Sequence, residues 1–350
     1  NVISNPSSSS DEGIKVKVNG TGEVFSGGIA NVPGAGMDIT LIKYNSAGTI
    51  TGSVLYGGSA NNEDILSSMT FDNSGNIYVC GRITQNITST DGVVLKYNSA
   101  LALQWVGVYF GAQGLLHDEF NKIAVDNSGN AYVCGSSALS GVDRDIITAK
   151  YNTAGVFQWA VRKNSPQGLI DEGISIAIDP EQNIFFTGYI STLSNNTEIL
   201  IYKYSSAGTE LWADTYIPNP NFEDKPVSVM ADGNGNIYLG GVSNSGEYDK
   251  DMLLIKYSQP LAVEPVSNEI PTEFSLSQNY PNPFNPVTNI KFSIPESGNV
   301  KLTIFDITGK IAAELLDESI NAGEYKIDFD ASALSSGVYF YRLQSENFSE

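Results

Sequence analysis

The chain has 350 residues, which is long for a single domain and leads us to expect two domains. A net charge of −20 argues against nucleic acid and anionic membrane surfaces as partners. With 41% hydrophobic residues, 34 glycines and 18 tyrosines, the composition favours short strands and tight turns. No apolar run approaches the roughly 18 residues of a membrane span. Because the chain begins at Asn1, we expect a processed or cut N-terminus, so the lack of a visible signal peptide proves nothing about export.

An internal repeat dominates the first three quarters of the chain. The decapeptides Asp72–Gly81 and Asp126–Gly135 differ at one position. An acidic pair recurs five times, with intervals of 52 to 55 residues, at Asp11-Glu12, Glu63-Asp64, Asp118-Glu119, Asp171-Glu172 and Glu223-Asp224. Five copies with a period near 50 predict a propeller or a solenoid. We therefore place repeats near residues 11, 63, 118, 171 and 223.

Each repeat contains the signals of four strands. After the acidic pair, alternating apolar residues such as Ile174–Ile178 predict a first strand, and an Asx-Gly turn such as Asp72–Asn76 predicts a hairpin to the second. The third strand ends in Lys-Tyr, and the fourth carries Trp105, Trp159 or Trp212 in the three middle copies. Four strands form one propeller blade, so the fold class is all-β, with a β-propeller over residues 1–258. The fifth copy stops after its third strand, and we expect residues 1–5 to complete that blade and close the ring.

The repeat words resemble those of the bacterial β-propeller repeat family of the SBBP type. The sequence motifs that carry the resemblance are Asp72–Gly81, Asp126–Gly135, Lys96–Asn98 and Lys150–Asn152. The resemblance covers about residues 11–258. It implies a propeller and no particular activity.

A second module follows a proline-containing stretch, 259–273, that we interpret as a linker. Short alternating strands are predicted over residues 274–350, and they indicate a small Ig-like β-sandwich. The predicted strands are Thr288–Ile294, Asn299–Asp306, Lys310–Leu316, Glu324–Phe329 and Val338–Leu343.

This module resembles the C-terminal sorting domain (type A) of the type IX secretion system. The matching words are Gln278–Pro286, Ile304–Gly309, Asp330 and Ser336–Leu343. The sorting-motif residues that we single out are Asn279, Tyr280, Pro281, Asn282, Pro283, Phe284, Asn285, Pro286, Gly309 and Gly337. The resemblance implies the type IX secretion machinery as a partner and a secreted or cell-surface location. Members usually end with a lysine-rich turn and a last strand, so we expect this module to be truncated at its end.

The acidic pairs have two interpretations. They would form a ring of carboxylates on one rim of the propeller, which suits a cation or a cationic ligand. Alternatively, each pair caps backbone N–H groups of its own or the adjacent blade, which we favour because a group present in every blade usually serves the blade. The Asx-Gly turns make Asp72, Asp126 and Asp232 weak calcium candidates, since they lack the further carboxylates of calcium loops. No other cofactor is indicated.

Other reactive residues do not form a catalytic constellation. Cys80 and Cys134 occupy a column of small residues, so we expect buried free thiols. His117, the single histidine, has no nucleophile in a recognisable motif and is expected to lie in an exposed loop. A sialidase is disfavoured because the propeller has only three arginines, Arg82, Arg144 and Arg162. The tryptophan and tyrosine columns are interpreted as packing between blades rather than as sugar platforms.

Recognition is expected where the copies differ. The variable segments are Arg82–Asp91, Ser136–Asp145, Tyr189–Glu198 and Val242–Asp251. The sequence favours an exported, non-catalytic binding or adhesion protein whose ligand is an extracellular polysaccharide or protein. The alternatives are a glycan-active hydrolase or lyase that uses carboxylates of the acidic rim, and a passive structural spacer.

Overall fold

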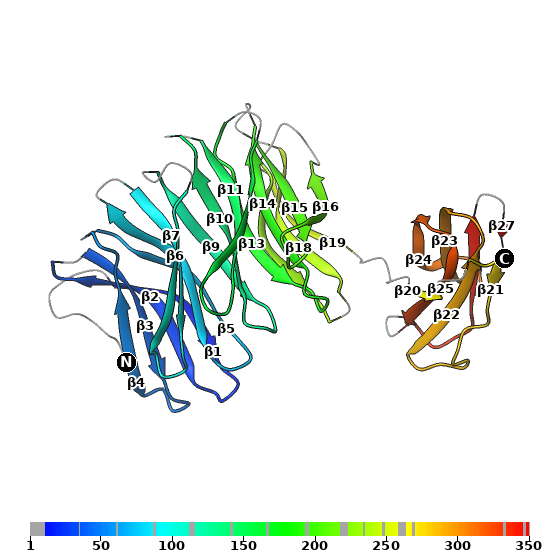
Figure 1. The fold of residues 1–350 in the computed structure, drawn as a ribbon, viewed down its shortest axis with the longest axis horizontal. Helices are drawn as coiled ribbons and strands as arrows, with labels where there is room; N and C mark the ends of the chain where they lie inside the picture. Colours follow the sequence, from blue (N-terminus) through cyan, green and yellow to red (C-terminus); the bar gives the residue numbers. More distant parts are fainter. Residues whose placement is uncertain are drawn as a thin grey trace. The chain divides into compact units, whose positions relative to one another are not determined.

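The fold was analysed in a computed structural model, which describes residues 11–34, 36–60, 62–86, 89–111, 116–140, 143–165, 168–192, 196–217, 223–233, 235–246, 249–257, 264–267, 270–331, 334–345 and 348–349. The chain divides into two compact units, Asn1–Tyr257 and Ser258–Glu350. In the described ranges, all regular secondary structure is β-strand (Figure 1). The all-β prediction is confirmed.

The described residues of unit 1 form five antiparallel sheets in chain order. The first sheet holds β1 (Glu12–Val18), β2 (Val24–Val32), β3 (Gly36–Tyr44) and β4 (Ile50–Tyr56). The second holds β5 (Ile65–Phe71), β6 (Ile77–Asn86), β7 (Ser89–Tyr97) and β8 (Leu103–Tyr109). The third holds β9 (Asp118–Val125), β10 (Ala131–Ala138), β11 (Arg144–Tyr151) and β12 (Phe157–Lys163). The fourth holds β13 (Glu172–Ile178), β14 (Ile184–Ser191), β15 (Thr197–Tyr204) and β16 (Glu210–Tyr216), and the fifth holds β17 (Lys225–Ala231), β18 (Ile237–Gly246) and β19 (Asp249–Tyr257).

The predicted hairpin turns are stabilised by their own aspartates. The Asp72 carboxylate accepts the backbone N–H groups of Ser74 and Asn76, each at 2.9 Å. Gly75 adopts a φ of 78°, which a residue with a side chain rarely does. Asp126 accepts equivalent bonds in the next repeat. These bonds satisfy the donors of the turn locally and explain why the same word recurs in successive copies.

The sheets are held together by apolar faces that meet in pairs. Phe25 and Leu41 of the first sheet pack with Met69, Val79 and Leu95 of the second. The same columns build the next three interfaces, between the second and third sheets, the third and fourth, and the fourth and fifth. Each interior sheet therefore uses one face against the preceding sheet and the other face against the following sheet, as propeller blades do.

The first and fifth sheets lie at opposite ends of this series (Figure 1). The fifth sheet has the order β17-β18-β19, without a fourth strand among the described residues. The predicted closure through residues 1–5 falls outside the described residues.

Unit 2 is a sandwich of two four-stranded sheets. The first sheet contains β20 (Glu264–Ser267), β25 (Gly323–Asp330), β22 (Val287–Ile294) and β21 (Ser275–Leu276). The second contains β24 (Ile311–Ile320), β23 (Gly298–Asp306), β26 (Tyr339–Ser345) and β27 (Phe348–Ser349). The core between them includes Ile290, Phe292, Leu302, Ile327 and Leu343. All five strands predicted here are present, with their ends shifted by a few residues.

The stretch predicted as a linker needs a correction. Glu264–Ser267 forms β20, which pairs with β25 across a register shift at Pro265. The absence of alternation misled the prediction, because an edge strand of four residues shows no period. A proline is tolerated there, since one side of an edge strand donates to no neighbour.

Candidate functional site

In four of the five acidic pairs one member is a buried aspartate that links neighbouring segments of the propeller, and these are Asp64, Asp118, Asp171 and Asp224. Asp64 accepts the N–H of Gly58, which follows the first sheet, at 2.5 Å, and the N–H of Thr84 in its own sheet at 2.6 Å. Asp171 repeats this bridge with Ser165 and Ser191. Burial raises the pKa of Asp64 and Asp171, and the backbone donors partly offset that rise. These bonds support the capping interpretation of the aspartates.

Only the aspartate of each acidic pair occupies an equivalent position in the five repeats. The repeats therefore align on this aspartate and not on the pair as a unit. The aspartates lie 53 or 54 residues apart, and they are Asp11, Asp64, Asp118, Asp171 and Asp224. Four of them accept the N–H group of the residue twenty positions later, and Asp118 accepts that of Gly111. The glutamate stands before the aspartate in two copies, at Glu63 and Glu223, and after it in the other three. The glutamates are therefore not equivalent. Glu172 accepts Tyr189 Oη at 2.6 Å, and Glu223 pairs with Lys225 at 2.5 Å.

A polar pocket of about 340 Å³ lies on this rim, where the second and third sheets meet. Two glutamates from the acidic pairs and two arginines from variable segments face it, together with hydroxyl, amide and imidazole groups. Its lining residues are Asn62, Glu63, Arg82, Thr84, Ser89, Thr90, His117, Glu119 and Arg144. We refer to it as the rim pocket.

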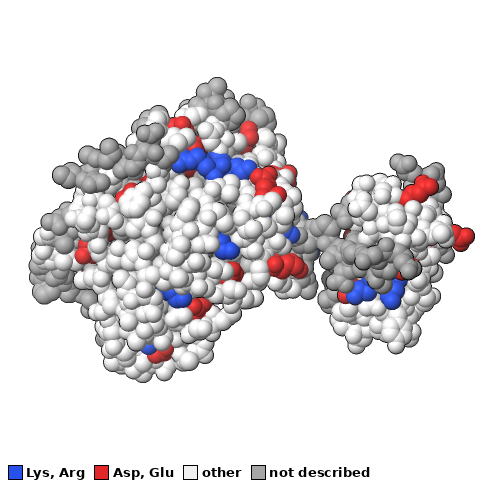
Figure 2. All heavy atoms as spheres, in the orientation of Figure 1, with Lys and Arg blue, Asp and Glu red and all other residues white. Residues whose placement is uncertain are grey.

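Ion pairs hold the arginines of the rim pocket in place. Arg82 contacts Glu119 at 2.8 Å through Nη1 and Glu63 at 3.4 Å through Nη2. Arg144 Nη1 lies 3.8 Å from Glu119. On the face of the molecule shown in Figure 2, basic side chains likewise lie beside acidic ones. The two arginines are partly exposed, so each keeps donors for a ligand.

Neutral polar groups complete the rim pocket. His117 Nδ1 lies 3.2 Å from Thr90 Oγ1, so the imidazole is positioned although it is exposed, as the sequence predicted. Ser89 is 1% exposed, and its hydroxyl has no protein partner. A buried hydroxyl without a partner costs free energy unless water or a ligand satisfies it. The arrangement therefore suits a ligand with several hydroxyl or carboxylate groups.

The rim pocket breaks the symmetry of the repeat. The strand pairing places Arg82 in the column of Ile29, Ser136, Tyr189 and Val242. Arg144 and Arg82 belong to the variable segments Ser136–Asp145 and Arg82–Asp91. Sequence reasoning did not bring them together, because they are 62 positions apart and only the stacking of the sheets joins them. The sequence signal that could have indicated this pocket is Arg82, which stands in a column that is otherwise neutral.

Asp91 and Asp118, which follow Thr90 and His117 of the rim pocket in the chain, are strongly buried. Asp91, at the start of the third strand, is 2% exposed. Burial raises its pKa to about 6, and the nearby Asp118 carboxylate adds to the rise. Burial also raises the pKa of Asp118 itself. Sequence analysis did not single out the column of Asp91, which Asp38, Asp145, Glu198 and Asp251 continue.

The calcium candidates already use their carboxylates within the turns. In addition to the N–H bonds above, Asp72 Oδ2 accepts Asn76 Nδ2 at 2.7 Å and Tyr78 Oη at 3.3 Å. Asp126 and Asp232 make the same side-chain bonds. In the described ranges, no three His, Cys, Asp or Glu side chains lie close enough to hold a metal ion.

Cysteine and tryptophan positions agree with the packing interpretation. Cys80 and Cys134 are buried free thiols. The Trp159 indole N–H donates to Ser206 O in the next sheet at 3.3 Å, and its ring lies against Gly208. The tryptophan column therefore joins neighbouring blades, and its rings are used between sheets.

Unit 2 presents its motif residues around two adjoining hollows of about 270 and 560 Å³. Asn282, Pro283, Phe284 and Gly337 line both, and Asn285 and Pro286 line the larger one. Asn279 is buried and donates through Nδ2 to Pro281 O at 3.2 Å and Thr288 Oγ1 at 2.9 Å. Tyr280 is 77% exposed. Gly309 closes the turn after β23 with a φ of 82°.

Among the described residues, no helix is long and apolar enough to cross a membrane.

Comparisons with known proteins identify both modules. Residues 278–350 match the family described as secretion system C-terminal sorting domain, and residues 109–138 match the family described as beta-propeller repeat. No curated protein sequence matches the chain.

Several solved structures are similar at low identity. A thermostable family-43 glycoside hydrolase is 12% identical, with 74% of this chain and 94% of that chain covered and a TM-score of 0.40. An α-L-arabinofuranosidase from Fusarium graminearum, in complex with an iminosugar inhibitor, is 11% identical, with 89% and 91% covered and a TM-score of 0.43. An endo-arabinase from Bacteroides thetaiotaomicron is 9% identical, with 71% and 94% covered and a TM-score of 0.37. Scores this low carry no conclusion about activity.

The fold, the motif residues and the two family matches agree. The chain therefore combines β-propeller repeats of the SBBP family with a C-terminal sorting domain of the type IX secretion system, and it is exported to the cell surface or the medium.

Proposed function

We propose that the exported propeller is a non-catalytic binding or adhesion protein that captures an extracellular polysaccharide through the rim pocket. The observation that carries the proposal is the loss of repeat symmetry at this pocket. Glu63, Arg82, Glu119 and Arg144 meet there in one network, and the symmetry is lost at the arginines, because the column of Arg82 holds only neutral residues in the other four copies. A pocket of about 340 Å³ lies in the range of small-ligand sites.

The chemistry of the lining favours a saccharide over an apolar ligand. Arginine forks, carboxylates and hydroxyl groups form hydrogen bonds with sugar hydroxyl or carboxylate groups. Arg82 and Arg144 bring two cations to the pocket, and Glu63 and Glu119 bring two carboxylates, so the charges balance and the lining offers both donors and acceptors to the hydroxyl groups of a sugar. Secretion places the propeller where such polymers occur.

A second candidate function is a glycan hydrolase or lyase, because Glu63 and Glu119 face one pocket. Both carboxylates contact Arg82, however. Arg82 thus engages both carboxylates, whereas glycoside hydrolysis needs two carboxyl groups that act on the substrate. The contacts of Arg82 therefore favour binding over catalysis.

A binding experiment with the full chain tests the proposal. A panel of neutral and acidic polysaccharides and matrix proteins is titrated with and without calcium, and each sample is assayed for cleaved products. We expect saturable binding to a polysaccharide without product. Arg144→Ala should weaken binding at least tenfold, because a charged hydrogen bond contributes about 1.5–3 kcal/mol.

The matched control is Lys163→Ala, which removes a cation that pairs with Glu210 outside the rim pocket. It should bind like the parent chain. Equal binding by Arg144→Ala would reject the rim pocket as the site. Product release that Glu119→Gln abolishes would instead establish the hydrolase or lyase.

A further inference from the structure

The ion pairs of the rim pocket restrict the charge of its ligand. Arg82 lies 2.8 Å from Glu119 and 3.4 Å from Glu63, and Arg144 lies 3.8 Å from Glu119. A carboxylate of a ligand would compete with these glutamates for the guanidinium groups and would bring a third negative charge beside two cations. A neutral ligand leaves the ion pairs in place. The balance of charges in the lining therefore favours a neutral ligand over an acidic one.

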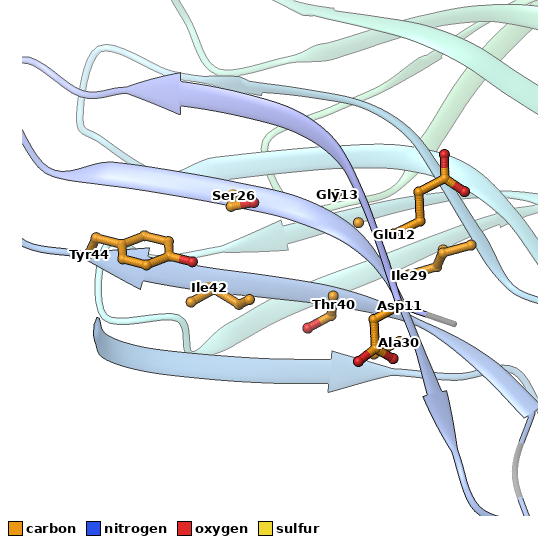
Figure 3. Close-up of a pocket in the computed structure, with 10 residues that line it drawn as sticks. Asp11, Glu12, Gly13, Ser26, Ile29, Ala30, Thr40, Ile42 and Tyr44 are labelled. Atoms are coloured by element: carbon orange, nitrogen blue, oxygen red, sulfur yellow. The ribbon is translucent and has the colours of Figure 1, made fainter. Parts of the chain in front are cut away.

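The first sheet shows the same rim position without an arginine. Ile29 occupies the column of Arg82. Together with Asp11 and Glu12 it borders a hollow of about 200 Å³, and the described residues that line this hollow include no lysine or arginine (Figure 3). The hollow of the first sheet is therefore acidic, whereas the rim pocket combines its acids with arginines.

Two buried groups of the rim pocket have no hydrogen-bond partner among the described residues, and they are Ser89 Oγ and Arg82 Nε. Ser89 is 1% exposed. The neighbouring hydroxyl groups are satisfied, because Thr84 Oγ1 donates to a backbone carbonyl group at 2.7 Å and Thr90 Oγ1 lies 3.2 Å from the imidazole of His117. Buried polar groups are normally paired, so the two exceptions indicate where a ligand completes the pocket.

The serine at this position is not a feature of the repeat. Ser89 opens β7, and the strand register places Gly36, Asp143 and Asn196 at the same position in the first, third and fourth sheets. A group that serves every blade would recur in every blade. Arg82, which stands in a neutral column, belongs to the same hairpin as Ser89. Both unpaired groups are therefore particular to this pocket.

We propose that the rim pocket binds a neutral sugar unit of the polysaccharide and that Ser89 determines its specificity, through a hydrogen bond between Ser89 Oγ and a hydroxyl group of the sugar. Arg82 Nε, which can only donate, binds a second oxygen atom of the same ligand. The proposal rests on the proposed function of the rim pocket, since it assigns a ligand class and a specificity-determining residue to that site. A ligand without the matching hydroxyl group leaves a buried group unpaired, which is how polar sites reject close analogues.

Calorimetric titration of the full chain tests the charge of the ligand. The probes are the neutral polymers dextran, arabinan and galactomannan and the carboxymethylated form of each, which keeps the backbone and adds negative charge. We expect saturable binding of a neutral polymer and about tenfold weaker binding of its carboxymethylated form, because the added carboxylates meet the glutamates of the pocket. Binding of the neutral polymer should change by less than about twofold between low and high salt, since it carries no charge for salt to screen.

Ser89→Ala tests the specificity-determining residue. Its affinity for the neutral polymer should fall about fivefold to tenfold, the contribution of one hydrogen bond. Its thermal unfolding midpoint should stay the same or rise slightly, because the Ser89 hydroxyl group has no partner among the described residues. A hydroxyl group with a structural role would give lower stability instead. Ser175→Ala is the matched control, since Ser175 is also 1% exposed, its Oγ is also unpaired among the described residues, and it lies outside the rim pocket. It should bind like the parent chain.

The outcomes separate this proposal from the proposed function. Equal binding by Ser89→Ala and the parent chain would overturn the role of Ser89 and leave the binding function intact. Tighter binding of a carboxymethylated polymer than of its neutral form would overturn the neutral ligand class. A loss of affinity in Ser175→Ala as large as that in Ser89→Ala would also overturn the proposal, because the effect would not be local to the pocket. If the parent chain binds none of the polymers, the proposed function fails and this proposal fails with it.

Discussion

The indole N–H of Trp105 donates to the carbonyl oxygen of Thr153 in the next sheet, 3.0 Å away. The ring lies against Gly155, in the turn that carries this carbonyl group. One residue thus supplies apolar area and a directed hydrogen bond between two blades. Trp159 makes the same pair of contacts one repeat later, so the period of the sequence is a period of contacts between blades.

Gly155→Ala should destabilise the propeller by about 2–4 kcal/mol, the combined cost of a side chain at positive φ and of overpacking. The added Cβ would lie 2.6 Å from Trp105 Cδ2, at a φ of 77°. Denaturant unfolding followed by tryptophan fluorescence measures the change, because all three tryptophans belong to the propeller.

Gly48→Ala is the matched control for this prediction. Gly48 has a φ of 78° in the equivalent turn of the first sheet, but nothing lies within 4 Å of its added Cβ. It should cost about 1 kcal/mol. Equal losses in the two variants would show that packing of the tryptophan on the turn contributes nothing.

The two acids of one pair should differ sharply in their effect on stability. Asp64→Ala leaves the buried N–H groups of Gly58 and Thr84 without an acceptor, and we expect a loss of about 3 kcal/mol. Glu63→Ala removes an exposed carboxylate with a long contact to Arg82 and should change stability by less than about 1 kcal/mol. The same fluorescence assay measures both. Similar losses would restore the interpretation in which the acidic pair acts as one unit.

Asp91 should make the propeller less stable as the pH rises from about 4 to about 6. Its pKa is raised to about 6, so the folded state holds the proton more tightly than the unfolded chain, whose aspartates titrate near 3.9. Stability is then fully present below about pH 4 and is lost as the pH passes the folded pKa. Asp91→Asn removes this loss and should stabilise the propeller by about 2 kcal/mol at pH 7.5.

The pH dependence itself distinguishes this effect from a simple packing change. The advantage of Asp91→Asn should vanish below about pH 4, where both side chains are neutral. A stabilisation by Asp91→Asn that is constant between pH 4 and pH 8 would contradict the assignment.

The sequence was sufficient for the parts of the fold that are coded locally. Alternation at Ile174–Ile178 and the word Asp72–Asn76 predict a strand and a hairpin because the residues that decide them are neighbours. The short strand β20 escaped prediction because its partner β25 begins more than 50 residues later. Its stability depends on that partner and not on its own residues.

The site shows the same division between local and distant information. Counting pairs of acids concealed the column of Asp64 and Asp171, because a neighbouring glutamate stands before the aspartate in some copies and after it in others. Only the bonded N–H groups identify the buried member. The rim pocket likewise depends on the stacking of two sheets, which sets Arg82 against Glu119. Variation between copies pointed to two segments that line the rim pocket but not to the residues that meet there.

The sorting motif should contain both structural and recognition residues, and two neighbours separate these roles. Asn279 is buried, and its amide bridges Pro281 and Thr288, so Asn279→Ala should cost the sandwich about 1–3 kcal/mol. Tyr280 is 77% exposed, so Tyr280→Ala should leave stability unchanged. If the secretion machinery recognises this surface, Tyr280→Ala should nevertheless lower export severalfold.

Export is measured as the fraction of the chain outside cells that carry the type IX system, and stability is measured by thermal unfolding of the purified variants. Ile311→Ala, which removes an exposed apolar side chain outside the motif words, is the control and should be exported normally. Normal export of Tyr280→Ala would show that the exposed tyrosine is not recognised and that the motif acts only by holding the sandwich together.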